Sequence, residues 1–404
     1  MAALTMTTRK IAFLTLSIAL MITLLAGALF GQPAPKGNLY RYLSIFSEVF
    51  DLVRSNYVEQ VSSDQLMEGA FSGVTDAIDE FSYYVPPAQM PAYKNFTDVE
   101  DNKVGLVVTK RFGYAFVIAP LAGSPAELAG VERGDFIDTI DGQATSKMPV
   151  WQIRNALATG KKVRLSVIRG GETKRQDVSI APSDFHPLAL TTDTISGIGY
   201  IKIPYFEKGT AEQFRAALAE VKKRGTRKLI VDVRGNAGGD VTEAIAAVDE
   251  LLAKGNITSL VGRKVETRQW RADANVAFDG DLEVLTDSST ASGAEVFAAA
   301  IRGNERGKVV GVTTYGKAIS QRFIPLATGG GVHMTVAHYT TPDAKPIKET
   351  GVRPDVIVDL SSQAIRDPKE EAAQPRDKRE DLILNKALSL FGATPKTPAL
   401  KKAA

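Results

Sequence analysis

The distribution of hydrophobic and polar residues divides the chain into segments of different character. Apolar residues recur at helical spacing in residues 39–58 and again in a second stretch that ends near Asp79. From about residue 98 to residue 182 the pattern changes to short β-rich runs separated by glycines, with two short helical stretches between them. The first part of the chain therefore predicts a small helical region followed by a compact β unit.

The region from about residue 186 to residue 360 alternates strands with helices. Runs rich in branched aliphatic residues, such as KLIVDV and LEVLTD, are separated by helical segments such as VTEAIAAVDELLAKG. Strands that alternate with helices of this length imply crossover connections and a largely parallel sheet. We therefore expect an α/β core here, followed by a charged tail that contains one amphipathic stretch, LILNKALSLF.

The N-terminus carries an uncharged apolar run, residues 11–30, preceded by Arg9 and Lys10. As a helix this run would be roughly 30 Å long, which matches a bilayer core. An Ala-Gly-Ala motif within it is typical of a cleavage site, but the run exceeds the usual signal-peptide core, and this favours an uncleaved anchor. The preceding positive charges predict a cell-envelope protein with its N-terminus in the cytoplasm and its remainder outside, or secreted after signal cleavage.

Composition excludes several classes of function. The 49 basic and 46 acidic residues give a net charge of +3, and no dense basic run is interleaved with aromatic residues, so we expect no nucleic-acid partner. The absence of cysteine excludes disulfides, thiolate nucleophiles and Cys-rich zinc sites. A chain of 404 residues is long enough for two or three domains.

The segment GVTTYGKAIS, residues 311–320, admits two kinds of chemistry. Gly311, Gly316 and Lys317 have the G-x-x-x-x-G-K spacing of a nucleotide-binding P-loop. A P-loop also needs a hydroxyl residue directly after the lysine and then a helix, whereas Ala318 and a strand-and-turn pattern follow here. The sequence therefore favours Lys317 as the base of a hydrolase.

A serine at a strand end provides a matching nucleophile. Ser292 lies between a strand predicted at 282–285 and a helix predicted from Gly293, which would place its hydroxyl at the carboxyl end of the sheet. A serine needs a base, and an amine kept uncharged by burial can serve where no histidine is placed to do so. The alternatives are that Ser292 is a helix N-cap and Lys317 a solvated loop residue.

A glycine-rich turn, RGNAGGDV, follows the strand KLIVDV. Backbone amides at Gly238 and Gly239 could point toward a developing oxyanion. The alternative is that these glycines only form a tight connection between a strand and a helix.

These segments together resemble the carboxyl-terminal processing peptidases, also called tail-specific proteases, over about residues 40–360. In that family a serine in a turn of small residues is followed closely by Glu, and a lysine follows in a T-[FY]-G-K context. Ser292, Glu295 and Thr314–Lys317 match this pattern. Further similar segments are Tyr57-Val58-Glu59, DEFSYY at 79–84 and YTTPDAKPIKETGVRPDVIV at 339–358, whereas TASGAE, Ala318 and the Asn236-Ala237-Gly238-Gly239 loop depart from the family pattern.

The resemblance implies a Ser-Lys serine endopeptidase with a crotonase-like α/β core and an inserted β-rich PDZ domain. Ser292 would attack the peptide carbonyl, uncharged Lys317 would act as general base, and Gln321, which shares a strand face with Ile319, would orient the lysine amine. The oxyanion donors would be the backbone N–H of Gly293 and that of Gly238 or Gly239. No metal or organic cofactor is required.

Residues 123–142, GSPAELAGVERGDFIDTIDG, resemble the core of a PDZ domain. PDZ domains bind the C-terminal tail of a polypeptide as an added strand at a sheet edge. The expected receiving edge is VGLVV, with Val104, Gly105, Leu106 and Val107 as peptide-binding residues. The alternative is a PDZ fold kept only as a gate or spacer.

The predicted organisation runs from the N-terminus to the C-terminus in six parts: a cytoplasmic N-terminus (1–10), a transmembrane anchor or signal peptide (11–30), a linker and helical region (31–97), a PDZ domain (98–182), a peptidase core (183–360) and a charged tail with a terminal helix (361–404). We expect an endopeptidase that recognises and cuts C-terminal tails of polypeptides. The alternative is an adaptor or pseudoprotease that binds such tails without cleaving them.

Overall fold

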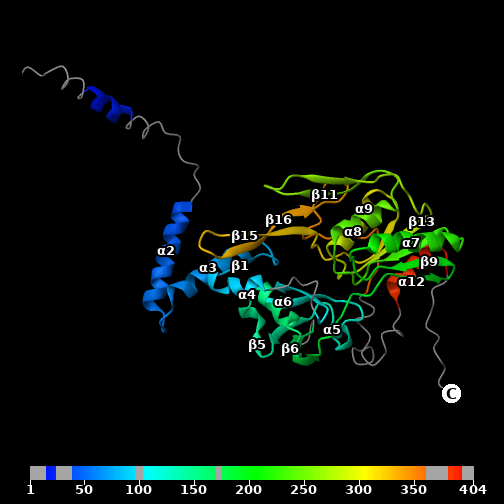
Figure 1. The fold of residues 1–404 in the computed structure, drawn as a ribbon, viewed down its shortest axis with the longest axis horizontal. Coiled ribbons are helices and arrows are strands. Elements are labelled where there is room, and N and C mark those ends of the chain that lie inside the picture. Colours follow the sequence, from blue (N-terminus) through cyan, green and yellow to red (C-terminus); the bar gives the residue numbers. More distant parts are fainter. Residues whose placement is uncertain (1–14, 24–38, 96–102, 170–174, 361–380, 394–404) are drawn as a thin grey trace, which may run out of the picture. The chain divides into compact units, whose positions relative to one another are not determined.

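The computed structural model describes residues 15–23, 39–95, 103–169, 175–360 and 381–393 (Figure 1). The chain divides into two units, Met1–Ala70 and Phe71–Ala404. The predicted cytoplasmic N-terminus and most of the predicted tail lie outside the described residues, as do both ends of the apolar run at 11–30. Within the described part, no helix has both the length and the apolar character needed to cross a membrane.

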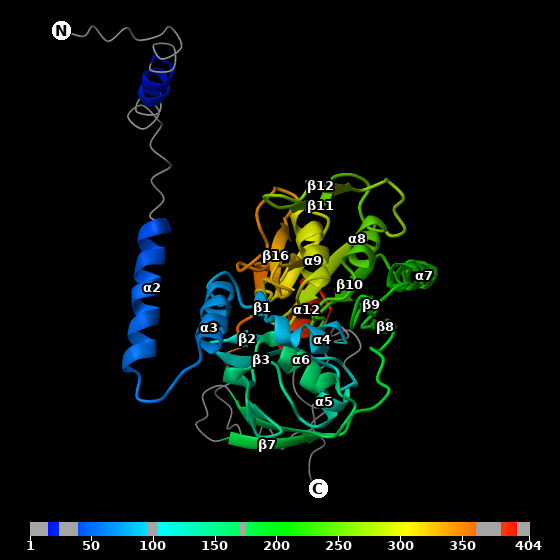
Figure 2. The same ribbon diagram turned by 60° about the vertical axis from the view of Figure 1, so that its left-hand side comes forward.

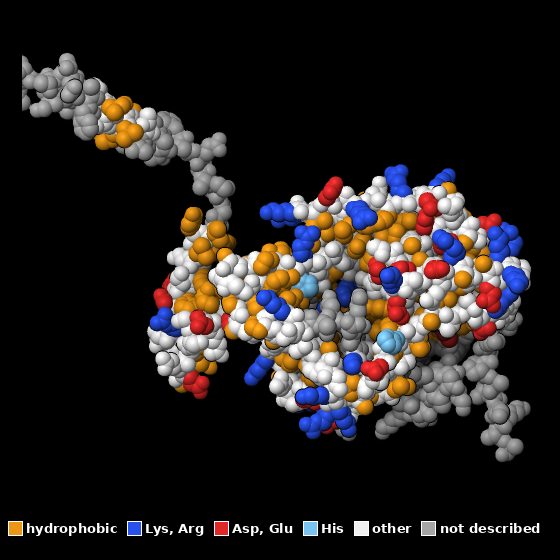
Figure 3. Space-filling model, viewed as in Figure 1, with side chains coloured by type: hydrophobic (Ala, Val, Ile, Leu, Met, Phe, Trp, Pro, Cys, Tyr) orange, Lys and Arg blue, Asp and Glu red, His pale blue; other side chains and the backbone are white. Residues whose placement is uncertain are grey.

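The first unit contains helix α2 (Leu39–Asn56) and the beginning of helix α3 (Ser63–Asp76), in agreement with the helical spacing of the sequence. Helix α2 has no buried residue. Figure 3 shows hydrophobic side chains along this helix, and large apolar residues such as Leu43, Phe46 and Leu52 are exposed.

The β unit of the second unit is an antiparallel sheet in the order β2-β3-β4-β6-β7. Its elements are β2 (Leu106–Arg111), β3 (Tyr114–Pro120), α5 (Pro125–Leu128), β4 (Phe136–Ile140), β5 (Gln143–Ala144), α6 (Val150–Ala158), β6 (Val163–Ile168) and β7 (Arg175–Ile180). Alternate strand residues such as Val108 and Val117 point inward and pack with Ile153 of α6. The two short helices predicted in this region are confirmed.

The α/β core contains a six-stranded sheet in which all neighbouring strands except β8 and β9 run parallel. Its strands, in spatial order, are β17 (Val356–Ile357), β14 (Lys308–Gly311), β13 (Asp281–Thr286), β10 (Lys228–Asp232), β9 (Ile198–Lys202) and β8 (Thr191–Ile195). The largely parallel sheet predicted from the alternating pattern is therefore confirmed.

Helices cover both faces of this sheet because its central strands are apolar on both sides. Helices α7 (Thr210–Lys223), α8 (Val241–Asp249) and α9 (Gly293–Gly303) pack on the face that includes Val231 and Val284. The C-terminal helix α12 (Leu382–Leu390) packs on the opposite face, against Ile230 and Leu285 (Figure 2).

A second, antiparallel sheet in the core was not predicted. It is formed by β1 (Tyr83–Val85), β16 (Gly331–Tyr339), β11 (Asn256–Val261) and β12 (Arg268–Arg271), and β15 (Ile319–Pro325) also pairs with β16. Its strands come from segments far apart in the sequence, so no local sequence pattern indicates that they pair. The segment that contains Lys317 connects β14 of the parallel sheet to β15 of this sheet.

Candidate active site

Three loops converge at the carboxyl ends of adjacent parallel strands. Strand β13 pairs with β10 on one side and with β14 on the other. The loop after β10 contains Gly238 and Gly239, the turn after β13 contains Ser292, and the loop after β14 contains Lys317. The carboxyl ends of parallel strands open at one edge of the sheet, which is the usual place for a ligand or substrate.

Ser292 is the N-cap residue of α9, with φ +53° and ψ −117°. An ordinary N-cap has an extended backbone, so this conformation is unusual for a serine and is typical of strained functional turns. The glycine loop approaches the same side chain, because a Cβ placed on Gly238 would lie 2.9 Å from Ser292 Cβ and 3.4 Å from Ser292 Oγ. The structure therefore brings the predicted nucleophile and the predicted oxyanion loop together.

Glu295 joins the serine turn to the lysine loop. Its Oε2 accepts hydrogen bonds from the backbone N–H of Ser292 at 2.9 Å and of Lys317 at 2.7 Å. Its Oε1 accepts from Gly316 N and from Thr314 Oγ1, each at 2.6 Å. Two residues distant in sequence thus have backbone amides within hydrogen-bond distance of one oxygen atom.

The Glu295 carboxyl is fully buried, and this burial raises its pKa to about 7, against the opposing effect of its four hydrogen-bond donors. In the sequence, Glu295 stands out only as part of a family pattern. The signal for its structural role was the S-x-x-E spacing of a capping box, in which the Glu side chain accepts from the N-cap amide.

The side chains of Lys317 and Gln321 both lie against Phe81. The Lys317 Nζ lies 5.6 Å from the centroid of the Phe81 ring, and Gln321 Nε2 donates to the Phe81 carbonyl at 3.0 Å. Phe81 and Ile319 belong to one buried hydrophobic cluster, so the lysine is half-buried in apolar surroundings. Sequence reasoning missed Phe81, which precedes β1 and is distant from both partners along the chain.

The two candidate oxyanion donors in the glycine loop, the N–H groups of Gly238 and Gly239, differ in their hydrogen bonds. The N–H of Gly238 donates to Asn236 Oδ1 at 3.0 Å, and the Asn236 amide nitrogen donates to the Ile203 carbonyl. Among the described residues, the N–H of Gly239 has no acceptor. The N–H of Gly293 lies in the first turn of α9, where amides have no intrahelical partner.

The predicted peptide-binding residues lie at an edge of the β unit, where β2 has a single strand partner, β3, within the described part of the chain. The carbonyls of Val104 and Gly105 accept from Ala126 N and Leu121 N. Gly105 has φ +66°, and a Cβ there would lie 2.3 Å from Ser124 Cβ, so the turn requires glycine. Leu106 and Val107 are the first residues of β2.

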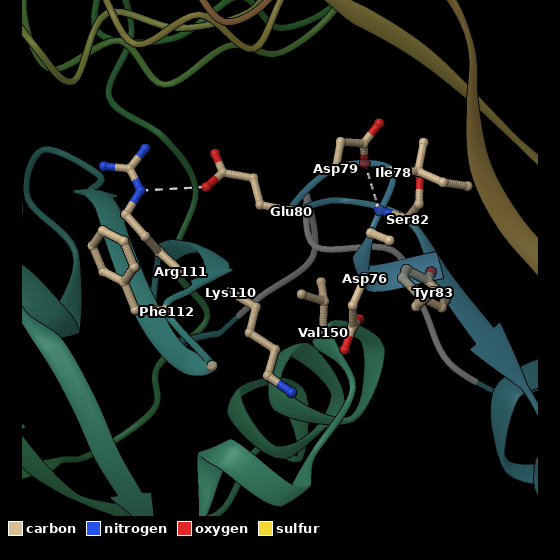
Figure 4. A pocket seen from close by; sticks show the side chains of 12 residues that line it. Asp76, Ile78, Asp79, Glu80, Ser82, Tyr83, Lys110, Arg111, Phe112 and Val150 are labelled. Atoms are coloured by element: carbon tan, nitrogen blue, oxygen red, sulfur yellow. Dashed lines mark hydrogen bonds and ion pairs between the residues drawn. The ribbon is translucent and has the colours of Figure 1, made fainter. Parts of the chain in front are cut away.

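Arg111, at the end of β2, links the β unit to the lysine loop. Figure 4 shows its guanidinium facing Glu80, and Arg111 Nε donates to Glu80 Oε2 at 3.3 Å. Arg111 Nη2 also donates to the Tyr315 hydroxyl at 3.2 Å, and that hydroxyl donates to Glu80 Oε1 at 2.6 Å. Tyr315 precedes Lys317 by two residues, so this network extends to the predicted base.

The structure excludes a P-loop at residues 311–320, because strand β15 rather than a helix follows Lys317. The backbone of Lys317 is instead joined through Glu295 to the backbone of Ser292, a serine at a helix N-terminus that a glycine loop approaches. A hydroxyl, an amine and backbone N–H groups are the components that acyl transfer requires.

Comparisons with known proteins agree with this chemistry. Residues 197–358 match the model of peptidase family S41, and residues 116–169 match that of a PDZ domain. The carboxy-terminal-processing protease of Bartonella bacilliformis is 29% identical over 95% of this chain and 96% of its own length. The carboxy-terminal processing protease CtpA of Bacillus subtilis is also 29% identical, over 79% of this chain and 69% of its own. The solved structure of the photosystem II D1 C-terminal processing protease is 26% identical with a TM-score of 0.63, and the match covers 78% of this chain and 92% of that one.

Proposed function

Because the chain belongs to peptidase family S41 and carries a PDZ domain, we propose that it hydrolyses peptide bonds with Ser292 as nucleophile and Lys317 as general base. It is a serine protease of the carboxyl-terminal processing type. The observation that carries the residue assignment is the Glu295 carboxylate, which accepts hydrogen bonds from the backbone N–H of both Ser292 and Lys317.

In the first step, Ser292 Oγ bonds to the carbonyl carbon while its proton moves to the uncharged Lys317 Nζ. The C–N bond then breaks, and the same proton passes from Lys317 to the leaving nitrogen. Water then attacks the acyl carbon of the resulting ester while Lys317 accepts one of its protons. The bond between this carbon and Ser292 Oγ breaks, the proton passes from Lys317 to Ser292 Oγ, and the carboxylic product leaves. The oxyanion that forms in acylation and again in deacylation is stabilised by the N–H groups of Gly293 and Gly239.

Gln321 supports the base indirectly in this mechanism. Its hydrogen bond to the Phe81 carbonyl fixes the residue whose ring lies beneath the Lys317 amine. Half-burial beside the apolar cluster of Phe81 and Ile319 removes part of the hydration of the amine, and loss of hydration favours the uncharged form that can accept a proton.

Substrate recognition is assigned to the PDZ edge. A polypeptide tail would add as a strand beside β2, with its terminal carboxylate received on backbone amides around the start of this strand, at Val104–Val107. The match of residues 116–169 to a PDZ domain and the terminal place of β2 in the strand order β2-β3-β4-β6-β7 support this assignment.

The direct test is cleavage of an unstructured peptide by the purified protein, with products identified by mass spectrometry and Ser292→Ala as control. We expect cleavage by the wild type and none by the variant. The same cleavage by Ser292→Ala would remove this serine from the mechanism. Tail binding without cleavage by the wild type would establish the alternative function, a PDZ-bearing adaptor.

We also assign residues 98–182 to the PDZ domain, 183–360 to a crotonase-like peptidase core, and 31–97 to a helical region behind a membrane anchor at 11–30. The length and uncharged character of the run at 11–30 support an anchor, and Arg9 and Lys10 support a cytoplasmic N-terminus. The full chain should then stay with membranes during alkaline extraction, whereas a chain that starts at Leu39 should be released. Release of both would contradict the anchor.

A further inference from the structure

Asp287 organises the turn that carries Ser292. It directly follows β13, and its Oδ1 accepts hydrogen bonds from the backbone N–H of Ser289 and of Thr290, both at 3.0 Å. The same oxygen accepts from Gly235 N, in the glycine loop, at 3.1 Å. One buried carboxylate oxygen thus holds both the nucleophile turn and the oxyanion loop.

The other oxygen of this carboxylate faces the PDZ domain. Arg133, in the loop between α5 and β4, donates from Nη1 to Asp287 Oδ2 at 2.6 Å. The Asp287 side chain is 11% exposed, so its charge is largely removed from water and is compensated by this guanidinium. A residue of the recognition domain therefore stabilises the carboxylate that shapes the catalytic turn.

A separate contact involves the end of the same turn. Ala291, which immediately precedes Ser292, belongs to a buried hydrophobic cluster that also contains Val107 and Ile118 of the PDZ sheet. The PDZ domain is thus associated with the nucleophile turn through an ion pair at its start and through apolar packing at its end.

We propose that Arg133 is a positioning residue for catalysis, which holds Asp287 in the orientation that fixes the Ser292 turn and the Gly235 loop. The proposal rests on the proposed function, and it assigns a catalytic contribution to a PDZ residue outside the predicted peptide-binding edge. Without the guanidinium, Asp287 would rotate toward water and its Oδ1 would leave the three amides. The nucleophile would then be misplaced although every reacting group is present.

The kinetic consequence separates this role from recognition. Loss of Arg133 should lower kcat and leave KM almost unchanged, because β2 and the residues before it remain intact. Arg133→Lys keeps a positive charge at the same place and should restore part of the loss. Arg175→Ala is the matched control, since Arg175 makes a 2.8 Å ion pair with Asp138 within the PDZ domain.

The experiment measures steady-state cleavage of a fluorogenic peptide by the full chain and its variants. We expect kcat to fall about tenfold or more in Arg133→Ala, with KM and the affinity for a tail peptide, measured in a Ser292→Ala background, changed less than about twofold. Arg175→Ala should stay within about twofold of the wild type. An unchanged kcat in Arg133→Ala, or a loss confined to KM, would overturn the proposal.

A second readout needs no activity. Amide hydrogen exchange at Gly235, Ser289 and Thr290 should accelerate in Arg133→Ala and stay at the wild-type rate in Arg175→Ala. Unchanged exchange at these three amides would overturn the positioning role even if the protein cleaves peptides. A wild type that cleaves nothing would contradict the proposed function, and the exchange data would still decide whether Arg133 holds the turn.

Discussion

Glu295 is buried and accepts hydrogen bonds from four donors, so its ionisation bears directly on the geometry around Ser292 and Lys317. An ionised carboxylate can accept all four, whereas a protonated one must use part of one oxygen as a donor. Since burial raises the Glu295 pKa to about 7, this change takes place near neutral pH. The site should therefore be fully ordered only above that pH.

The first prediction concerns the pH dependence of cleavage. In the wild type, kcat should fall as the pH decreases through about 7, because protonated Glu295 releases an amide of the serine turn or the lysine loop and protonated Lys317 cannot accept a proton. In Glu295→Gln, kcat should be lower by about tenfold or more. The part of the fall in kcat near pH 7 that is due to protonation of Glu295 should disappear. A kcat–pH profile of both proteins measures this, and an unaltered inflection in the Gln variant would contradict it.

The second prediction concerns the approach of Gly238 to Ser292. Gly238 has φ +134°, which a side chain rarely adopts, and an added Cβ would lie 2.9 Å from Ser292 Cβ. Gly238→Ala should therefore displace the loop or the serine and lower kcat/KM by about a hundredfold. Gly197→Ala is the control, since Gly197 has φ +78° and no heavy atom within 4 Å of an added Cβ. Equal activity of the two variants would show that the close approach is unimportant.

For individual residues, the sequence predicted which side chains belong to the candidate site better than it predicted their contacts. Ser292 and Lys317 stand out because each interrupts a regular pattern of strands and helices with a loop of small residues. The role of Gln321 in orienting the lysine amine stays a prediction, and the structure shows its amide donating to the carbonyl of Phe81, whose ring lies beside that amine. A contact through a third residue distant in sequence leaves no local signal.

Among the elements, helix α12 connects the C-terminal end of the chain to the oxyanion loop. Arg234, which directly precedes Gly235, donates to both oxygens of Asp381 at 2.6 and 2.9 Å. Asp381 is also the N-cap of α12, since its Oδ1 accepts from Leu384 N. On its other side Arg234 pairs with Asp232, whose pKa burial would raise but which Arg234 and Lys202 hold well below its ordinary value.

The third prediction tests this connection. Asp381→Ala removes both the ion pair and the N-cap, and the free energy of unfolding should fall by about 1 kcal/mol, because Asp381 is partly exposed and its charge is screened by solvent. Asp343→Ala removes an exposed ion pair with Lys345 and should cost less than about 0.5 kcal/mol. Urea unfolding measures both, and equal stability of the two variants would contradict the proposed role of Asp381.

The elements themselves were largely predictable where the pattern was local. Strands such as β10 and β14 contain runs of branched aliphatic residues, and helices such as α7 and α9 lie between successive strands of the sheet. The antiparallel sheet was missed because β1 pairs with β16, about three-fifths of the chain length later, and neither segment alone indicates a partner. The pairing of distant strands depends on tertiary structure, and the hydrophobic periodicity of a single segment does not predict it.

For the whole molecule, the PDZ domain is in contact with the loops that carry the proposed catalytic residues. Its Arg111 joins Glu80 to Tyr315, and its apolar residues Val107 and Ile118 share a cluster with Ala291 and Ile319. The order of the domains follows from their different sequence patterns. Their mutual contacts do not, because they depend on single side chains at loop and strand ends.

The fourth prediction concerns Arg111. Because Arg111 donates to Tyr315, two residues before the proposed base Lys317, Arg111→Ala should lower kcat by about tenfold. Arg164→Ala, an exposed arginine on β6 of the same domain, should leave kcat within about twofold of the wild type. Peptide cleavage at saturating substrate distinguishes the two variants. Equal rates would show that the Arg111 network does not contribute to catalysis.

Covalent labelling with a small fluorophosphonate tests whether Lys317 activates Ser292. Peptide mapping by mass spectrometry should place the label on Ser292 in the wild type, and the labelling rate should fall by about a hundredfold or more in Lys317→Ala. Labelling of Ser292 at the wild-type rate in that variant, or modification of a different residue in the wild type, would contradict the account.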